Sequence, residues 1–83
     1  MTEVLLSKRA VDRLSALESD VQDRIKDSLR EIDPARDLSR LSGEDEFALR
    51  VGEYRVIVDW DRSGDTVYVL TLGHRRNIYD REW

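Results

Sequence analysis

The chain has 83 residues, carries a formal net charge of -4 and contains no cysteine. This length suits one small domain, and the lack of cysteine excludes disulfides, thiolate metal sites and cysteine nucleophiles. With 40% hydrophobic and 39% charged residues, the composition is typical of a folded domain with a densely charged surface. We expect one cytoplasmic domain over residues 1–83, because no apolar run is long enough for a membrane span or a signal peptide.

The net negative charge argues against general affinity for nucleic acid, since phosphate binding depends on lysine and arginine. Lys8 and Lys26 are the lysines, and every other basic residue is arginine. Aspartate also outnumbers glutamate, and an Asp-rich, Lys-poor surface favours solubility in concentrated salt. The positions of the arginines are therefore more informative than the total charge.

The first part of the chain predicts a strand followed by two helices. Residues 2–6 contain a short apolar run that Ser7 ends in an N-cap position. Residues 19–22 interrupt the helical pattern with a capping-box sequence, and Pro34 ends it. Apolar residues at intervals of three and four define the helical faces: Ala10, Val11, Leu14, Leu17, Val21, Ile25, Leu29 and Ile32. We expect two antiparallel helices joined by a tight turn.

The second part predicts three strands. Residues 35–45 form a polar connection, from which Leu38 and Leu41 reach the core. Beyond it the apolar period becomes two, over 46–51, 54–60 and 67–72, with turns at 52–53 and 63–64. The predicted fold is α+β: an N-terminal strand, a helical hairpin and a three-stranded meander, with the helices on one face of a four-stranded sheet.

The first turn places two arginines together. If Gly52 and Glu53 are the loop residues, Arg50 lies opposite Arg55 on the sheet face away from the helices. Two facing arginines repel each other unless an anion lies between them. One interpretation is pairing with nearby acids, namely Glu46, Glu53 or Asp59. The other is a phosphate site, because guanidinium groups bind phosphate bidentately.

The second turn extends this face toward the C-terminus. It places Leu72 opposite Arg55, and by the same count His74 lies on the arginine face unless a bulge at Gly73 shifts the strand. Histidine exchanges protons near neutral pH, so this one is our candidate for proton transfer. A lone histidine predicts no metal site, and no phosphate-loop motif is present, so we expect no cofactor.

The same register predicts a partner surface. Apolar side chains share the arginine face, where no helix of the chain remains to cover them: Ile57, Leu70 and Leu72. Exposed apolar surface ringed by charge is typical of a docking site. We expect a partner helix or strand that carries acids toward the arginines, with Trp83 as a further anchor. The alternative is a homodimer through this face.

Two stretches carry a resemblance to a known family. Residues 49–57, LRVGEYRVI, and 69–79, VLTLGHRRNIY, resemble the RelE/ParE superfamily of toxins from toxin–antitoxin pairs. The length and the helical hairpin agree, so the resemblance covers essentially the whole chain. It implies a RelE-like fold and a toxin that cuts mRNA, in the RelE branch within the ribosomal A site. It also implies a cognate antitoxin that wraps around the toxin.

The resemblance also implies roles for individual side chains. Arg55 and Arg75 match family arginines that stabilise the anionic transition state of a metal-free cleavage by the RNA 2′-hydroxyl. Tyr79 matches the closing tyrosine, and we assign proton transfer to His74. Arg50 and Arg76 are expected to bind RNA. Where the best-studied branch has lysines, this chain has Glu46 and Ala48.

Two alternatives remain within the same family. A ParE-like toxin binds DNA gyrase without any chemistry, and it does not need the arginine–tyrosine set. A degenerate relative is an inactive module that only binds an antitoxin. Arg55, Arg75 and Tyr79 favour the endoribonuclease.

Overall fold

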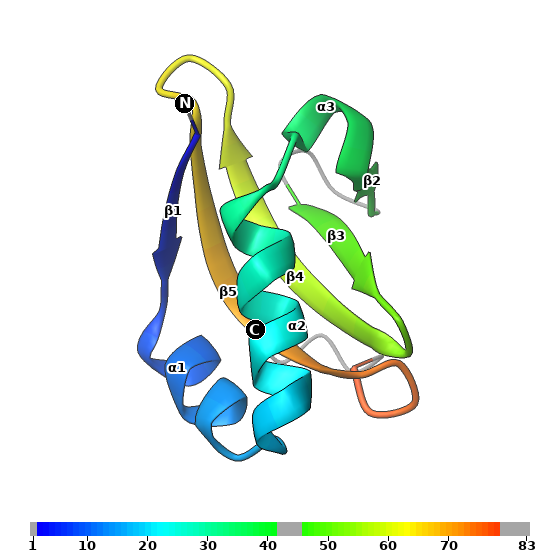
Figure 1. The fold of residues 1–83 in the computed structure, drawn as a ribbon. Coiled ribbons are helices and arrows are strands. Elements are labelled where there is room, and N and C mark those ends of the chain that lie inside the picture. The colour runs from blue at the N-terminus through cyan, green and yellow to red at the C-terminus, as the bar shows by residue number, and fades with distance from the viewer. Residues whose placement is uncertain (1, 42–45, 79–83) are drawn as a thin grey trace.

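The computed structural model describes residues 2–41 and 46–78, and within them the chain forms an α+β fold, as predicted (Figure 1). In chain order the elements are β1 (Glu3–Leu6), α1 (Lys8–Ser15), α2 (Ser19–Arg30), α3 (Pro34–Asp37), β2 (Leu38–Arg40), β3 (Glu46–Val51), β4 (Tyr54–Asp61) and β5 (Thr66–His74). They build one 5-stranded sheet of order β1-β5-β4-β3-β2. The sheet has one strand more than expected, because β2 pairs with β3 in the segment predicted to be a plain connection.

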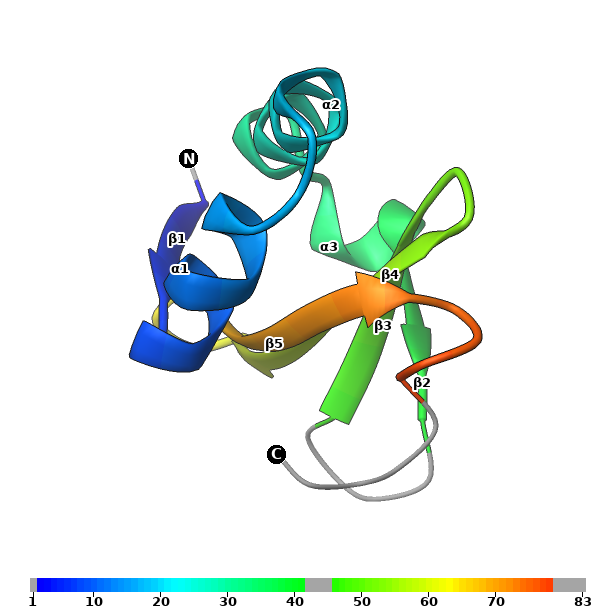
Figure 2. The same ribbon diagram turned by 90° about the horizontal axis from the view of Figure 1, so that it is seen from below.

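Strand β1 pairs in parallel with β5, whereas the other pairs are antiparallel. The hairpin of α1 and α2 lies on one face of this sheet, with α1 beside β1 and β5 (Figures 1 and 2). No helix within residues 2–41 and 46–78 is long and apolar enough to cross a membrane.

The apolar core lies between the helices and the sheet. Its buried members are Ala10, Leu14, Ile25, Leu29, Ile32, Phe47, Leu49, Val51, Val56, Val58, Val67, Val69 and Leu72. Burial of each valine, leucine, isoleucine or phenylalanine side chain contributes about 1.5 to 3 kcal/mol before the loss of conformational entropy. Leu38 packs against this core as predicted, and Leu41 is half-buried.

Ser7 caps α1, as predicted, and also ties the helix to the sheet. Its side-chain oxygen accepts a hydrogen bond from the Ala10 amide at 3.1 Å and donates one to the Leu70 carbonyl at 2.7 Å. A single hydroxyl therefore joins the point where β1 ends to the middle of β5.

The capping box predicted at the start of α2 is wrong. Glu18 is the N-cap residue and makes no side-chain cap bond. Gln22 donates instead to the Leu17 carbonyl at 2.8 Å. The glutamine thus satisfies a carbonyl of the tight turn between the two helices and stabilises that turn.

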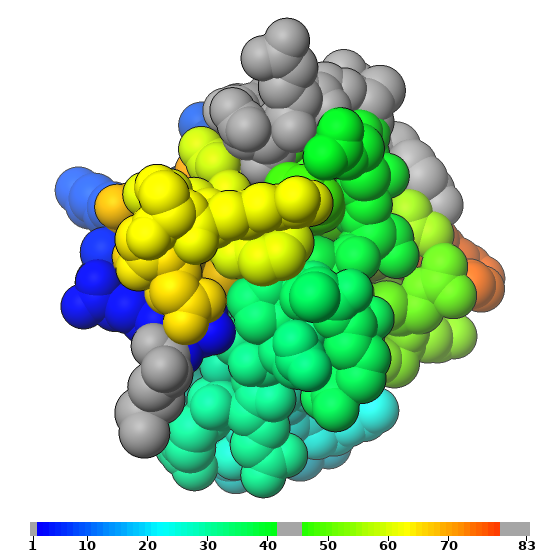
Figure 3. All heavy atoms as spheres, turned by 90° about the horizontal axis from the view of Figure 1, so that it is seen from above, coloured from blue at the N-terminus to red at the C-terminus, as the bar shows by residue number. Residues whose placement is uncertain are grey.

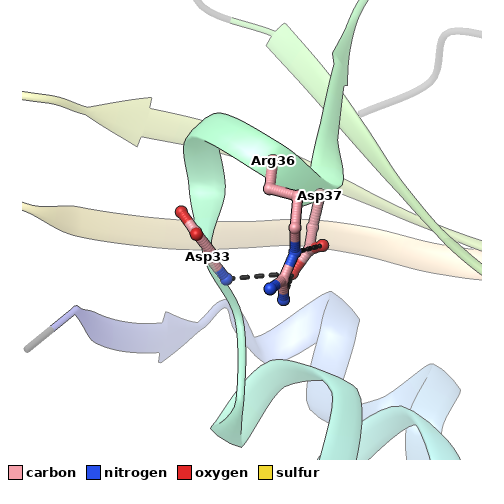
Figure 4. A network of polar contacts seen from close by, with 3 residues as sticks. All are labelled: Asp33, Arg36 and Asp37. Atoms are coloured by element: carbon pink, nitrogen blue, oxygen red, sulfur yellow. Dashed lines mark hydrogen bonds and ion pairs between the residues drawn. The ribbon is translucent and has the colours of Figure 1, made fainter.

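The single-turn helix α3 is held by a small polar network (Figure 4). The Asp37 carboxylate accepts a hydrogen bond from the Asp33 amide at 2.9 Å and binds the Arg36 Nε at 2.8 Å. The hydrogen bond from Arg36, followed by that from the Asp33 amide, lowers the pKa of Asp37. The network closes the turn that directs the chain from Pro34 into β2.

Two arginines make cation–π contacts at the end of the sheet that lies opposite the β3–β4 turn. Arg40 lies over Phe47 at 5.5 Å, and Arg62 lies over Trp60 at 4.7 Å. These side chains border a hollow of ≈ 410 Å³ between β2 and the β4–β5 turn. Figure 3 shows this end, with the turn in yellow beside α3 and β2 in green.

The predicted register of β3 and β4 is confirmed. A two-residue turn at Gly52 and Glu53 joins them, and Gly52 has the positive φ of 58° that a tight hairpin turn requires. Arg50 lies opposite Arg55, and the pairing continues unshifted to the far end of β3.

The register of β4 and β5 agrees with the prediction only near their turn. Asp59 faces Tyr68 as expected, but Ile57 faces Thr71, so Leu70 is an extra residue in β5. This β-bulge lies where β1 leaves the sheet, and the Leu70 carbonyl accepts the Ser7 hydroxyl there. The start of α1 thus provides a partner for backbone that the ladder leaves unpaired.

The bulge corrects two predicted positions. Leu72 lies opposite Val56 and is fully buried against the helices, not opposite Arg55. His74 lies opposite Tyr54, so by alternation it belongs to the helix side and not to the arginine face. A one-residue shift in register moves every later side chain to the other face.

Candidate functional site

The arginine pair lies on the sheet face away from the helices. Its neighbours in sequence, Leu49, Val51 and Val56, point into the core, so Arg50 and Arg55 point the other way. Arg50 is exposed and Arg55 is half-buried. Within residues 2–41 and 46–78, Arg50 makes no ion pair. The pair therefore concentrates positive charge on one small area of an acidic protein.

The turn after β5 brings two more arginines to this end of the molecule. The Arg75 amide donates to the Glu53 carbonyl at 2.8 Å, which fastens this turn to the β3–β4 turn. Arg75 and Arg76 are both exposed, and neither makes an ion pair with a described residue. Figure 2 shows the two turns at the same end of the fold.

His74 holds the turn that carries these arginines. Its Nδ1 accepts a hydrogen bond from the Arg76 amide at 3.2 Å, and its Nε2 lies 3.3 Å from a carboxylate oxygen of Glu53. An Nδ1 that accepts an amide proton leaves the ring proton on Nε2, which donates to Glu53. The ring also meets Tyr54 edge to face at 5.5 Å. Both ring nitrogens are thus engaged in supporting the turn.

Glu53 is one of the acids that could have paired with Arg50 or Arg55. Its carboxylate contacts His74 and not an arginine of the sheet. Glu46 and Asp59 face each other at the far end of the β3–β4 ladder from Arg50 and Arg55. Within the described residues no group of three or more histidines and acids is placed to hold a metal ion.

The expected exposure of Ile57 and Leu72 is wrong. Their exposed fractions are 2% and 0%, and Leu70 is half-buried at the bulge. Ile78, beyond β5, is also buried at 4%, and its Cδ1 lies 3.5 Å from the position that a Cβ on Gly73 would take. The chain after the turn therefore folds back onto the sheet.

Two expected site residues, Tyr79 and Trp83, lie outside the described residues. Their roles stay predictions.

An apolar groove lies elsewhere, between β1 and α2. Its lining is Thr2, Val4, Leu6, Leu14, Lys26, Leu29 and Arg30, around a volume of ≈ 450 Å³. Leu5 and Leu6 are exposed to 43% and 36%, unusually high for leucines in a strand. The sequence indicates this groove only through the apolar run at residues 4–6. That run lies in β1, which is an edge strand of the sheet. The groove has an apolar floor and a basic rim.

Residues 4–79 match the family model of the ParE toxin of type II toxin–antitoxin systems, parDE. The chain belongs to this family. It is therefore a toxin of a type II toxin–antitoxin system, and the resemblance to the RelE/ParE superfamily is confirmed. No curated protein sequence matches the toxin significantly.

Solved structures show the same fold. The toxin–antitoxin complex RelBE2 from Mycobacterium tuberculosis matches with a TM-score of 0.79 and 23% identity, over 92% of this toxin and 93% of that chain. The archaeal RelE–RelB complex from Pyrococcus horikoshii matches with a TM-score of 0.76 and 25% identity, over 92% and 97%. The isolated RelE toxin of E. coli matches with a TM-score of 0.73 and 20% identity, over 89% and 84%.

Proposed function

We propose that this toxin is a metal-independent endoribonuclease that cleaves mRNA in the A site of the translating ribosome and so inhibits translation. The observation that carries the proposal is the facing pair of Arg50 and Arg55, with Arg75 fastened to the same end of the sheet through Glu53. Two arginines held opposite each other repel, and RNA phosphates bound to them reduce that repulsion.

The chemistry suits this arrangement. The 2′-oxygen of the RNA attacks the adjacent phosphorus, and the bond from phosphorus to the 5′-oxygen breaks, which leaves a 2′,3′-cyclic phosphate and a 5′-hydroxyl. Water takes the proton from the 2′-hydroxyl, and the 5′-oxygen gains a proton from water as it leaves. Arg55 and Arg75 stabilise the dianionic phosphorane between these steps. Arg50 and Arg76 hold the flanking phosphates.

Proton transfer is no longer assigned to His74, in contrast to the expectation. His74 supports the turn of Arg75 and Arg76 and belongs to the helix side, so we propose a positioning role for it. Tyr79 remains our candidate to orient the 2′-hydroxyl or to stack on a base. Positively charged arginines alone accelerate cleavage by stabilising the transition state, so this site works without a strong base, at a lower rate.

A second candidate is binding to DNA gyrase without chemistry. The family model that matches is that of the ParE toxin. In addition, this chain has Glu46 and Ala48 at the positions where the RelE branch has lysines, so it lacks two basic residues of that branch. Both functions use the same fold, so an activity assay must separate them.

The experiment is mRNA cleavage in a reconstituted translation system, together with a gyrase supercoiling assay. We expect the wild type to cut mRNA only during translation, and Arg55→Ala and Arg75→Ala to reduce the rate by roughly 100-fold each, as loss of a transition-state donor does. Arg62→Ala, at the opposite end of β4, is the matched control and should cleave normally. No cleavage by the wild type, with inhibited supercoiling, would establish the second candidate.

We further propose a cognate antitoxin as the partner, with an amphipathic, acidic segment in the groove between β1 and α2. The support is the apolar floor with Lys26 and Arg30 at its rim, and the toxin–antitoxin complexes among the similar structures. This location replaces the surface expected at Ile57, Leu70 and Leu72. Leu6→Asp should abolish antitoxin binding in a titration and leave cleavage intact, and unchanged affinity would refute this location.

A further inference from the structure

Arg24 reaches the arginine site from a distant part of the chain. It belongs to α2, yet its Nη2 lies 2.8 Å and its Cζ 3.6 Å from the position that a Cβ on Gly52 would take. The guanidinium therefore lies on the β3–β4 turn, in the space of the side chain that Gly52 lacks. Figures 1 and 2 show the first half of α2, this turn and the turn after β5 at one end of the molecule.

Arg24 makes no ion pair within residues 2–41 and 46–78, although Asp20 and Asp27 stand on the same helix. Asp27 pairs instead with Arg30, at 3.4 Å. The acid of the turn itself, Glu53, contacts His74. The structure records no hydrogen bond from the Arg24 guanidinium to a described residue, so its donors face no protein acceptor there.

The turn separates two groups of positive charge. Arg50 and Arg55 lie in the ladder directly behind it, on the face away from the helices. Arg24 lies over Gly52 from the helix side. A flexible polyanion that crosses the turn meets both groups in succession, whereas a single small anion does not.

We propose that Arg24 binds a phosphate of the RNA strand next to the cleaved one, and so extends the RNA path over the β3–β4 turn onto α2. This inference rests on the proposed function. The ligand is the sugar–phosphate backbone of single-stranded RNA, which arginine recognises by charge and bidentate hydrogen bonds without reading the base. Arg24 is a binding residue that contacts no reacting atom, and its effect falls on affinity.

The purely structural alternative is that Arg24 only shields the turn. That role would depend on the shape of the guanidinium and its contact with Gly52, and would show as a lower melting temperature. A phosphate contact depends on charge, so Arg24→Lys should preserve most of it. The salt dependence of binding separates the two roles, because each lost phosphate contact lowers the slope of log K against log [salt] by about one.

The test measures binding first and cleavage second, on the full chain. A fluorescent 2′-O-methyl RNA of mixed sequence, which cannot be cleaved, is titrated at several KCl concentrations with wild type, Arg24→Ala, Arg24→Lys and the control Arg62→Ala. We expect Arg24→Ala to lower affinity roughly fivefold to tenfold, with a salt slope smaller by about one. Arg24→Lys and Arg62→Ala should stay within about twofold of the wild type, and all melting temperatures should agree.

On translating ribosomes we expect Arg24→Ala to raise KM by a similar factor and to leave kcat nearly unchanged. The inference is overturned if Arg24→Ala binds like Arg62→Ala, if its salt slope is unchanged, or if wild type does not bind the probe at all. Failure of the proposed function looks different, because the probe is bound through Arg24 but the wild type cuts no mRNA.

Discussion

Arg50 and Arg55 lie directly opposite each other in the ladder of β3 and β4, on the face away from the helices. Facing like charges destabilise a sheet, and Arg50 makes no ion pair with residues 2–41 and 46–78. A protein that holds such a pair is more stable with an anion bound than without. The arginine pair therefore favours RNA binding at a cost in stability, and substitutions can measure the two effects separately.

Arg50→Ala should make the toxin slightly more stable and less active. Removal of one charge relieves the repulsion, by up to about 1 kcal/mol, which corresponds to a melting temperature higher by a few degrees. RNA affinity should fall, because a phosphate contact is lost. Thermal unfolding followed by circular dichroism, at low and high salt, checks the first part. A lower melting temperature at low salt would contradict the repulsion.

Leu72→Ala should destabilise the toxin strongly. Leu72 is fully buried under the helices, and truncation of such a leucine costs about 2 to 5 kcal/mol. Leu5→Ala, at a leucine of the same sheet that is 43% exposed, should cost far less. Urea unfolding of both variants measures the difference. Equal urea midpoints for the two variants would contradict the burial of Leu72, and with it the bulge at Leu70 that turns Leu72 toward the core.

Gly52→Ala should lower stability because of the turn geometry. The φ of 58° costs about 1 kcal/mol or more for a residue with a Cβ, and the new methyl group would meet the Arg24 guanidinium. The guanidinium is the end of a flexible side chain, so it should move away. RNA affinity should then drop in Gly52→Ala about as it does in Arg24→Ala. The double variant should bind RNA no worse than either single variant, which a titration would show.

His74→Ala should reduce cleavage by loosening the turn that carries Arg75 and Arg76. If His74 only positions this turn, the shape of the pH–rate profile should match that of the wild type, at a lower rate throughout. His74→Gln keeps a side chain able to accept from the Arg76 amide and should restore part of the rate. If His74→Gln is as slow as His74→Ala, and both lack a pH-dependent limb that the wild type shows, His74 transfers a proton instead.

Asp61 should make stability depend on pH. Its carboxylate accepts hydrogen bonds from the Ser63 hydroxyl at 2.8 Å, the Ser63 amide at 3.1 Å and the Gly64 amide at 3.3 Å. The Ser63 hydroxyl, followed by the Gly64 amide, lowers the pKa of Asp61. A carboxyl group with a lowered pKa stabilises the fold above its unfolded value of about 4, and this contribution is lost as the pH falls through the folded value.

Asp61→Asn keeps the acceptor oxygen and removes the charge. Its melting temperature should therefore be a few degrees below that of the wild type at pH 7, and the difference should close toward pH 2. Melting curves at four pH values between 7 and 2 provide the check. A difference that stays constant down to pH 2 would show that the charge is not the cause.

Local sequence determined most of the helices and strands and one register of this protein, but not α3 and β2. A glycine in a two-residue loop specifies a tight hairpin, so the turn at Gly52 and Glu53 predicted that Arg50 faces Arg55, and the structure confirms it. The cap at Ser7 and the helix end before Pro34 also depend on a few neighbouring residues. The main charge feature of the candidate site could therefore be predicted.

Only the tertiary structure decided what depends on contacts between distant segments. The bulge at Leu70 forms where the Ser7 hydroxyl reaches β5, and the resulting shift moves Leu72 into the core and His74 away from the arginine face. Arg24 joins the site because its side chain reaches from α2 to Gly52 in the β3–β4 turn. Neither the bulge nor the place of Arg24 leaves a signal in local periodicity. The total charge of -4 excluded little, because a few arginines from separate elements gather at one end of an acidic chain.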